Sequence, residues 1–454
     1  MQVTNRPELT VKIESLSNLG FGVAKSNGYV IFVESACPGD KVKIRLIKEN
    51  KSFARAKILE IITPSPHRTE PFCPMQKICG ACQLQFIDYD YQLLLKKEIV
   101  KDTIRSICGG DIEVRDVIKS PKDREYRHKI QYPVSETKNS KRILAGYYKQ
   151  GSHELVNIKY CPIQPEYCDG IIEFIRESAK ECGVSGYDEK NHRGELKHIV
   201  IRTSRLNKKS LVTLVVNSAD ISDNIRRLAN AVFTKLPDTA GAAVNFNPAK
   251  TNLIFGENTQ ILEGQGFVEE ELCGRIFKIG VKTFFQVNPY TAENIFRFVK
   301  NYISSNFEAP VILDAYAGIA AFGICLSDIS KKAVCVEEVK ESVLSAEETI
   351  RENGIKNIKL YNADAEKFFE QELNSNSKYD ITILDPPRKG CSEKSLEYIL
   401  KLTKSKIIYV SCNPASLARD LKYLIQKGCK ADFIQPFDMF PHSYHIESAA
   451  LITV

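Results

Sequence analysis

The C-terminal part of the chain alternates apolar strands with helical patterns, and this rhythm constrains the fold more than any other feature. Between residues 286 and 454 the strand-like segments read VILDAY, AVCVEE, IKLYNA, YDITILD, KIIYVSC, ADFIQPF and AALITV, with helical periodicity between them. Strands that alternate with helices build a mostly parallel sheet. We therefore predict an α/β domain over residues 286–454, with any ligand at the carboxyl ends of its strands.

Acidic residues follow these predicted strands with the spacing of a nucleoside-binding site. VILDAYAGIAAFG enters a turn of small residues, where Gly318 would let the backbone approach a cofactor. Glu337 ends the next strand and could accept both ribose hydroxyls, whereas Asp364 could face an adenine. Asp385 ends the fourth strand. The turn lacks the full Gly-x-Gly-x-x-Gly that seats a pyrophosphate, which favours S-adenosylmethionine over a dinucleotide. A turn that binds no cofactor is the alternative.

Cys412 is the candidate nucleophile and Glu447 the candidate base. In IIYVSCNPASLARDL a buried strand ends at Cys412, beside the presumed cofactor. A helix that begins after Pro414 could lower the pKa of the thiol through its N-terminal dipole. Glu447, in HSYHIESAALITV, can reach the same edge as a general base. Taken alone, Cys412 could equally be a small core residue and Glu447 a solvated loop acid.

Four cysteines in the first half have the pattern of a metal site. Cys73, Cys79 and Cys82 are spaced C-x5-C-x2-C, and Cys161 follows in KYCPIQ. Four thiolates suit either tetrahedral zinc or a four-iron cluster. Zinc ribbons usually offer two C-x2-C pairs and this chain offers one, so the spacing favours iron–sulfur. Unligated core cysteines are the simpler interpretation.

The residues before 286 divide into two further regions. Residues 1–62 read as five short strands with turns between them, which predicts a small OB-type barrel, a fold that often binds RNA. Residues 63–72 are rich in proline and predict a linker. Residues 73–285 are mixed α+β, with a helix expected over Tyr89–Cys108. In the basic segment 119–134, Tyr126 and Tyr132 could stack on bases; a solvated strand face is about as consistent with the pattern.

Composition narrows the cellular setting. The net charge of +7 makes nucleic acid a plausible partner without establishing it. The first residues contain no apolar core of signal-peptide length, and no apolar stretch is long enough to span a bilayer. We expect a cytoplasmic protein with no membrane association, whose 14 cysteines are mostly reduced.

Five motifs together resemble a known family. FFQVN (284–288), DPPRKG (385–390), SCNP (411–414), HIES (445–448) and the four-cysteine pattern are similar to those of bacterial RNA uracil-C5 methyltransferases, in particular the iron–sulfur 23S ribosomal RNA enzymes with a TRAM domain. The resemblance implies a TRAM barrel, a central iron–sulfur domain and a Rossmann-like class I methyltransferase domain, with residues 89–117 packed against the last. It also implies the following roles: Cys412 as nucleophile; Glu447 as base; Gln286, Tyr316, Glu337 and Asp385 as S-adenosylmethionine ligands; and Cys73, Cys79, Cys82 and Cys161 as ligands of a 4Fe–4S cluster.

The chemistry of such an enzyme explains this residue set. Carbon 5 of uracil is a poor nucleophile toward a methyl sulfonium, and a thiolate that adds to carbon 6 creates an enolate rich in electron density at carbon 5. After methyl transfer a base removes the proton from carbon 5, and the thiol is eliminated. One Cys, one carboxylate and one methyl donor are therefore the minimum set.

One departure and several alternatives accompany the resemblance. Ala320 stands where the family usually has its second turn glycine, and a methyl group there could crowd the methionine moiety or demand another backbone angle. Arg388 after Pro387 argues against cytosine-C5 and amino-group methyltransferases. A transfer RNA enzyme, or a non-catalytic RNA-binding or ribosome assembly factor with a decayed site, remains open. So do the identity and the number of the target uridines.

Overall fold

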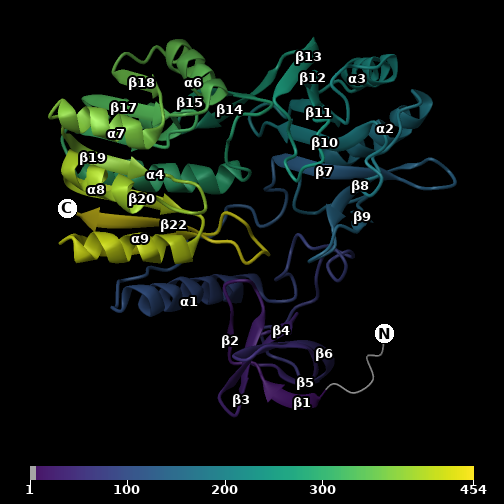
Figure 1. The fold of residues 1–454 in the computed structure, drawn as a ribbon, viewed down its shortest axis with the longest axis horizontal. Helices are drawn as coiled ribbons and strands as arrows, with labels where there is room; N and C mark the ends of the chain where they lie inside the picture. The colour runs from purple at the N-terminus through teal and green to yellow at the C-terminus, as the bar shows by residue number, and fades with distance from the viewer. Residues whose placement is uncertain (1–6) are drawn as a thin grey trace.

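Three large sheets and one two-stranded hairpin organise residues 7–454, the part of the chain that the computed structural model describes. Residues 1–6, which the predicted barrel also includes, lie outside this range. Figure 1 shows a small N-terminal sheet set apart from two larger parts, the central one and the C-terminal one. None of the helices in residues 7–454 combines the length and the apolar surface that crossing a bilayer requires.

The N-terminal sheet curls into a small barrel. Its strands pair in the order β1-β5-β6-β4-β3-β2, and β1 also contacts β3 across the three strands between them. Within residues 7–63 the strands are β1 (Glu8–Lys12), β2 (Ser15–Leu16), β3 (Gly22–Ser26), β4 (Tyr29–Glu34), β5 (Lys41–Glu49) and β6 (Phe53–Thr63). The prediction of five strands was wrong by one. The first predicted strand breaks at Ile13 and Glu14, because the chain changes its partner there: β1 pairs with β5, whereas the Glu14 N–H donates to the Val23 carbonyl and β2 pairs with β3.

The predicted linker is fastened to this barrel. Residues 64–72 form neither helix nor strand, as expected for a Pro-rich segment. However, Asp40 is fully buried and its carboxylate accepts from the backbone of Ser65 at 2.8 Å and from the Arg68 guanidinium at 2.7 Å. The Arg68 guanidinium also lies over the Phe86 ring. The segment therefore joins the barrel to the following residues by defined contacts.

The central part is a mixed sheet with two helices on it. Its strands pair in the order β13-β12-β11-β10-β7-β8-β9. The elements are β7 (Lys129–Glu136), β8 (Ile143–Tyr148), β9 (Leu155–Asn157), α2 (Tyr167–Glu181), β10 (Leu196–Thr203), β11 (Ser210–Val216), α3 (Asp223–Lys235), β12 (Thr239–Phe246) and β13 (Asn258–Gly264). Tyr126 and Tyr132 are buried in its core, so the idea that they stack on RNA bases was wrong.

The C-terminal part is the predicted α/β domain. Its sheet has the order β18-β17-β16-β19-β20-β22-β21, in which β22 runs antiparallel to both of its neighbours. All seven predicted strands form: β16 (Val311–Ala315), β17 (Lys332–Glu337), β18 (Ile358–Asn362), β19 (Tyr379–Leu384), β20 (Thr403–Ser411), β21 (Lys430–Phe437) and β22 (Glu447–Thr453). The central strands β16, β19, β20 and β22 are buried on both faces, and they read as near-continuous apolar runs in the sequence.

Helices cover both faces of this sheet. On one face lie α4 (Pro289–Asn306), α5 (Ala321–Cys325), α6 (Lys340–Glu352) and the hairpin of β14 (Phe267–Leu272) with β15 (Arg275–Gly280). On the other lie α7 (Ala365–Asn374), α8 (Glu393–Leu402), α9 (Pro414–Gln426) and α1 (Tyr89–Cys108). The hydrophobic core around this sheet therefore includes α1, β14 and β15, which precede residue 286 in the chain. The division of the chain into three domains stays a prediction.

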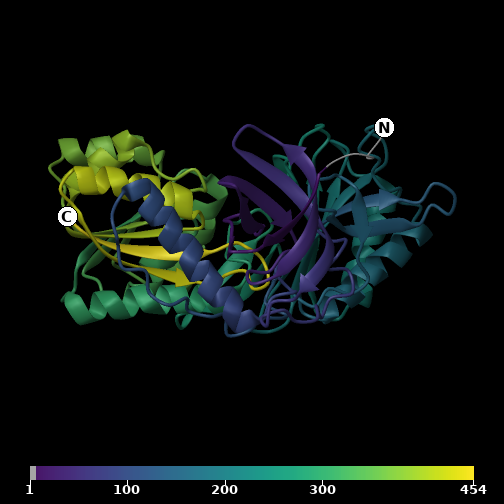
Figure 2. The ribbon, with the colours of Figure 1, turned by 90° about the horizontal axis from the view of Figure 1, so that it is seen from below.

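The helix α1 has the range that the sequence predicts. It packs on the C-terminal sheet, although all the strands of the central sheet lie between the two in the chain. The Asp88 side chain caps its first turn, and Gly109 ends it in the left-handed conformation. Its apolar stripe, including Leu95 and Ile99, packs against α9. Figure 2 shows α1 lying across the C-terminal part and reaching toward the centre of the molecule.

Candidate active site

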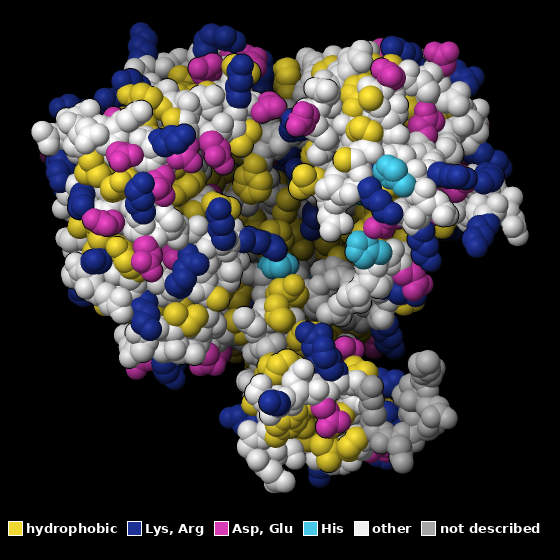
Figure 3. Space-filling model, in the orientation of Figure 1, with side chains coloured by type: hydrophobic (Ala, Val, Ile, Leu, Met, Phe, Trp, Pro, Cys, Tyr) yellow, Lys and Arg dark blue, Asp and Glu magenta, His cyan; other side chains and the backbone are white. Residues whose placement is uncertain are grey.

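A cavity of about 690 Å³ lies where the parallel strands of the C-terminal sheet end. Figure 3 shows the molecule hollowed at this edge, between its C-terminal and central parts, with apolar side chains on the floor. Its size is typical of a small-molecule site. The seven residues predicted from sequence to bind cofactor or to react all line it: Gln286, Tyr316, Glu337, Asp364, Asp385, Cys412 and Glu447.

Glu337 stabilises the turn after β16 by accepting hydrogen bonds from backbone amides. One carboxylate oxygen of Glu337 accepts from the Gly318 N–H and the other from the Val339 N–H, both at 2.8 Å. Tyr316, which follows β16, has a φ of 62° and Gly318 one of 56°. Positive φ at a non-glycine residue is uncommon and concentrates at functional sites. Asp364 is similarly anchored, because it caps α7 by accepting from the Lys367 N–H.

Ala320 keeps the backbone angle that glycine would adopt. Its φ is 54°, in the left-handed region that favours glycine, and its side chain is fully buried in the core. Ile319 and Ala321 line the cavity, whereas Ala320 is not among its lining residues. The methyl group therefore packs away from the cavity, and the expected crowding of a bound methionine moiety is not observed.

Cys412 stands between β20 and α9 and is half-buried. Burial raises the pKa of its thiol to about 11, helped by the charges of Glu447 and Asp385 and opposed by the nearby Arg388 guanidinium. The expectation that α9 lowers this pKa was wrong. The amide of Ala415 at the helix N-terminus is already satisfied by the Asn413 side chain, at 3.1 Å, and the acids of the cavity disfavour a thiolate.

Glu447 is a buried acid, not a solvated loop residue. It begins β22 and is 3% exposed. Burial raises its pKa well above the usual range, as does the neighbouring Asp385, while Arg388 opposes the shift. Burial likewise raises the pKa of Asp385 to about 7. A carboxyl with a raised pKa is a stronger base once it is ionised, which suits proton abstraction from carbon.

Arg388 is a site residue whose role the sequence reasoning missed. That reasoning used it only to exclude other methyltransferases. Its backbone carbonyl accepts from the Asn413 side chain at 3.1 Å, which ties DPPRKG to SCNP, and the residue lines the cavity. Its charge acts on both Cys412 and Glu447. The signal that could have identified Arg388 is its positive charge three residues after Asp385, the acid that ends the fourth predicted strand.

Three aromatic residues complete the wall. Phe284, Phe440 and His445 line the cavity, and Phe284 is 62% exposed. Burial lowers the pKa of His445 to about 4, with a contribution from Arg388, so its imidazole is neutral at physiological pH. Phe284 lies in the motif FFQVN, His445 lies in HIES, and Phe440 precedes HIES by five residues. An aromatic residue in or near a motif can equally line a cavity or pack in the core, so the sequence did not identify these three.

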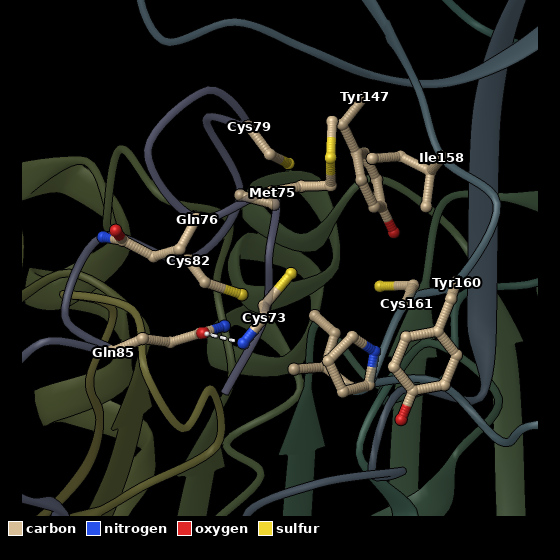
Figure 4. A pocket seen from close by; sticks show the side chains of 13 residues that line it. Cys73, Met75, Gln76, Cys79, Cys82, Gln85, Tyr147, Ile158, Tyr160 and Cys161 are labelled. Carbon is tan, nitrogen blue, oxygen red and sulfur yellow. Dashed lines mark hydrogen bonds between the residues drawn. The ribbon is translucent and has the colours of Figure 1, made fainter. Parts of the chain in front are cut away.

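The four predicted metal ligands meet at a second, smaller pocket. Cys73, Cys79, Cys82 and Cys161 line it together with apolar side chains, and Figure 4 shows their sulfurs around one space. Burial raises the thiol pKa of both Cys82 and Cys161 to about 12.

Neither metal assignment is confirmed for these cysteines. In residues 7–454 no group of three or more His, Cys, Asp or Glu side chains is found in an arrangement that could hold a metal ion. The iron–sulfur prediction and the zinc alternative therefore both stay predictions. The chemistry of the donor set, four thiols that line one apolar space, suits a four-iron cluster.

The family model described as tRNA (Uracil-5-)-methyltransferase matches residues 88–454, and that of the TRAM domain matches residues 2–59. Similar proteins named "Uncharacterized RNA methyltransferase" occur in Halalkalibacterium halodurans, at 35% identity over 99% of this chain and 98% of that one, and in Gloeobacter violaceus, at 37% over 98% and 96%.

A solved structure supports the same assignment. The tRNA (uracil-54, C5)-methyltransferase of Pyrococcus abyssi, in complex with S-adenosyl-L-homocysteine, is 26% identical, with a TM-score of 0.76 over 98% of this chain and all of that one. The chain described here therefore belongs to the tRNA (uracil-5-)-methyltransferase family and is an S-adenosylmethionine-dependent RNA methyltransferase.

Proposed function

We propose that the protein methylates carbon 5 of a uridine in structured RNA, with Cys412 as nucleophile and Glu447 as base. The observation that carries the proposal is the convergence of both residues on one cavity, together with the acids at the ends of β17, β18 and β19. These residues are spread over residues 286–447 of the chain.

The cavity residues divide into a cofactor side and a base side. Glu337 and Asp364 would hold the ribose and adenine of S-adenosylmethionine, while Tyr316, Gln286 and Asp385 would contact the remainder. S-adenosylmethionine supplies an electrophilic methyl group when it is bound. Glu337, whose oxygens already accept from two backbone amides, retains lone pairs for ribose hydroxyls.

Cys412, Arg388 and Glu447 would act on the uracil. Burial raises the pKa of the Cys412 thiol to about 11, so the free protein carries mainly the thiol. Its proton would pass to solvent as the sulfur attacks the uracil, and the Arg388 guanidinium would stabilise the thiolate. The sulfur adds to carbon 6, and carbon 5 takes up the methyl group. Glu447 then accepts the carbon 5 proton, the sulfur–carbon bond breaks, and the thiolate returns. The neutral His445 and the exposed Phe284 would contact the base.

We further propose that Cys73, Cys79, Cys82 and Cys161 hold a 4Fe–4S cluster that supports the fold and RNA binding. The support is their position around one apolar pocket. Protein purified without oxygen should contain close to four iron atoms and four sulfides per chain. If such protein contains no iron, the cluster assignment is wrong, whereas the proposed methylation chemistry is unaffected.

The substrate we favour is 23S ribosomal RNA, and transfer RNA is the second candidate. The TRAM domain and the cysteine pattern favour the first, whereas the Pyrococcus relative, named for uracil 54 of tRNA, favours the second. The decisive experiment incubates the protein with labelled S-adenosylmethionine and either RNA lacking 5-methyluridine, followed by nucleoside analysis. Label in 5-methyluridine from one RNA would confirm the reaction and identify the substrate class. No label from either would overturn the proposed function.

A further inference from the structure

The loop of residues 438–446 carries two cavity residues and leads directly into a third. It connects β21 to β22. Phe440 and His445 lie within it, and Glu447 follows it at once. Because the loop contains no helix or strand, its position depends on contacts with other elements.

A fully buried ion pair fastens the start of this loop to α1. The Lys96 ammonium donates to the Asp438 carboxylate at 2.5 Å and to the Phe440 carbonyl at 3.1 Å. Both side chains of the pair are 0% exposed, and 342 positions separate them in the chain. Lys96 is thus a buried charge that the proposed reaction does not use.

Gln92, one turn earlier on α1, holds the middle of the loop. Its side-chain oxygen accepts from the His442 N–H at 3.2 Å, and its amide group lies 3.2 Å from the His442 ring nitrogen. The same amide donates to the Leu84 carbonyl at 3.1 Å, and the Leu84 N–H donates to the His442 carbonyl at 2.9 Å. The loop therefore forms a small hydrogen-bonded network with the start of α1.

The opposite side of the loop is held by other elements. The side chains of Asn288 and Tyr126 donate to backbone carbonyls of the loop, at 3.1 Å and 3.0 Å. The His442 ring also lies 3.5 Å from the Asp123 carboxylate, whose side chain is 41% exposed. Among these contacts, the one with α1 buries two opposite charges completely.

Buried ion pairs rarely increase stability over apolar side chains of the same size, because both charges lose their water. They do fix one geometry, since any displacement separates the charges in a medium of low polarity. We propose that Lys96 and Asp438 are a positioning pair that keeps the 438–446 loop, and with it His445 and Glu447, against the cavity. This inference rests on the proposed function of Glu447.

Loss of the Lys96–Asp438 ion pair should slow the proton transfer to Glu447 and leave the affinity for S-adenosylmethionine unchanged. Glu337 ends β17, Asp364 caps α7 and Asp385 follows β19, so these residues lie outside the loop. A displaced Glu447 would slow removal of the carbon 5 proton, so the methylated protein–RNA adduct would persist. Misplacement of a catalytic group by about 1 Å costs on the order of 100-fold in rate.

The test compares Lys96→Met/Asp438→Asn with Lys97→Met. The double variant removes both charges, so no charge is left buried alone, and folding is checked by thermal unfolding. Lys97 is the matched control, since it is the next residue on α1 and pairs with the exposed Asp116 at 2.7 Å. We expect the double variant to bind S-adenosylhomocysteine normally, to lose about 10- to 100-fold in kcat and to accumulate adduct on denaturing gels. Lys97→Met should match the wild type in all three.

Amide hydrogen exchange provides a readout that does not depend on RNA. Peptides covering residues 438–446 should exchange faster in the double variant, while those covering β17 and α7 stay unchanged. A folded double variant with wild-type kcat and wild-type exchange in the loop would overturn the proposal. If wild-type protein methylates no RNA, the proposed function has failed, and the exchange result still decides whether the pair positions the loop. Faster exchange with unchanged kcat would make the pair merely structural and also overturn the inference.

Discussion

The active-site cavity and the cysteine pocket are built in opposite ways. In the cavity, regular elements place the side chains: Glu337 ends β17, Asp364 caps α7, and Cys412 lies between β20 and α9. In the cysteine pocket, Cys73, Cys79 and Cys82 lie in a segment without helix or strand, and Cys161 follows a short strand. A sheet edge is stable without its ligand, whereas an irregular segment gains order from whatever its side chains bind. Loss of a ligand group should therefore have different consequences at the two sites.

The largest effect is expected from Cys412→Ala. The cavity keeps its shape because β20 and α9 do not depend on the thiol, but no covalent adduct with uracil can form. Methylation should fall below detection while the affinity for S-adenosylhomocysteine, measured by calorimetry, stays within about twofold. Residual methylation by the purified variant would show that Cys412 is not the nucleophile.

Next in size is Glu447→Gln, which leaves the nucleophile and removes the base. Turnover should fall by roughly 10²–10⁴-fold, as for other general bases. Because addition and methyl transfer still occur, an RNA-linked protein band should appear on denaturing gels. The carboxylate control is Glu347→Gln, at an exposed position of α6, which should behave as the wild type. A variant that turns over slowly without the adduct would assign Glu447 another role.

A smaller and different effect is expected from Cys82→Ser in the cysteine pocket. The serine cannot replace a thiolate ligand, and a buried hydroxyl without a partner costs about 1–3 kcal/mol. Thermal unfolding should occur several degrees lower and the iron content should drop, whereas cofactor affinity should be unchanged. Cys182→Ser, at a half-buried cysteine outside the pocket, should alter neither. Equal iron content in both variants would contradict the ligand assignment.

The smallest effect is expected from Ala320→Gly. Glycine relieves a left-handed backbone that costs an L-residue about 1–2 kcal/mol, but loses a buried methyl group worth about 0.8 kcal/mol and adds freedom to the unfolded chain. These contributions nearly cancel, so the unfolding temperature should change by no more than about 3 °C. Cofactor affinity should stay the same because the methyl group does not line the cavity. A large gain in affinity would revive the crowding hypothesis.

Much of the secondary structure could be predicted from the sequence because its signals are local. Seven apolar strands, the α1 range and the alternation in β5, where Val42 and Ile44 are buried, all follow from side-chain periodicity. The extra strand in the barrel escaped prediction because one continuous sequence pattern changes its pairing partner, from β5 for β1 to β3 for β2, and a partner is not a local signal. The burial of Tyr126 and Tyr132 escaped it because a basic, aromatic segment has the same composition in a core strand and on an RNA-binding surface.

The sequence by itself determined which residue types are present in the motifs. It also determined that the strands before Asp385 and Cys412 end at one sheet edge, since parallel strands share a direction. Glu447 reaches the same edge because it begins the antiparallel β22. Only the tertiary structure decided the electrostatics of that edge. The thiol pKa of Cys412 is raised first by burial and then by Glu447, which a separate strand brings beside it, and Arg388 offsets that charge from a third segment. Likewise, no local pattern pairs Lys96 with Asp438. Their contact exists because α1 packs across the sheet, and the low polarity of that interior is what makes the two charges depend on each other.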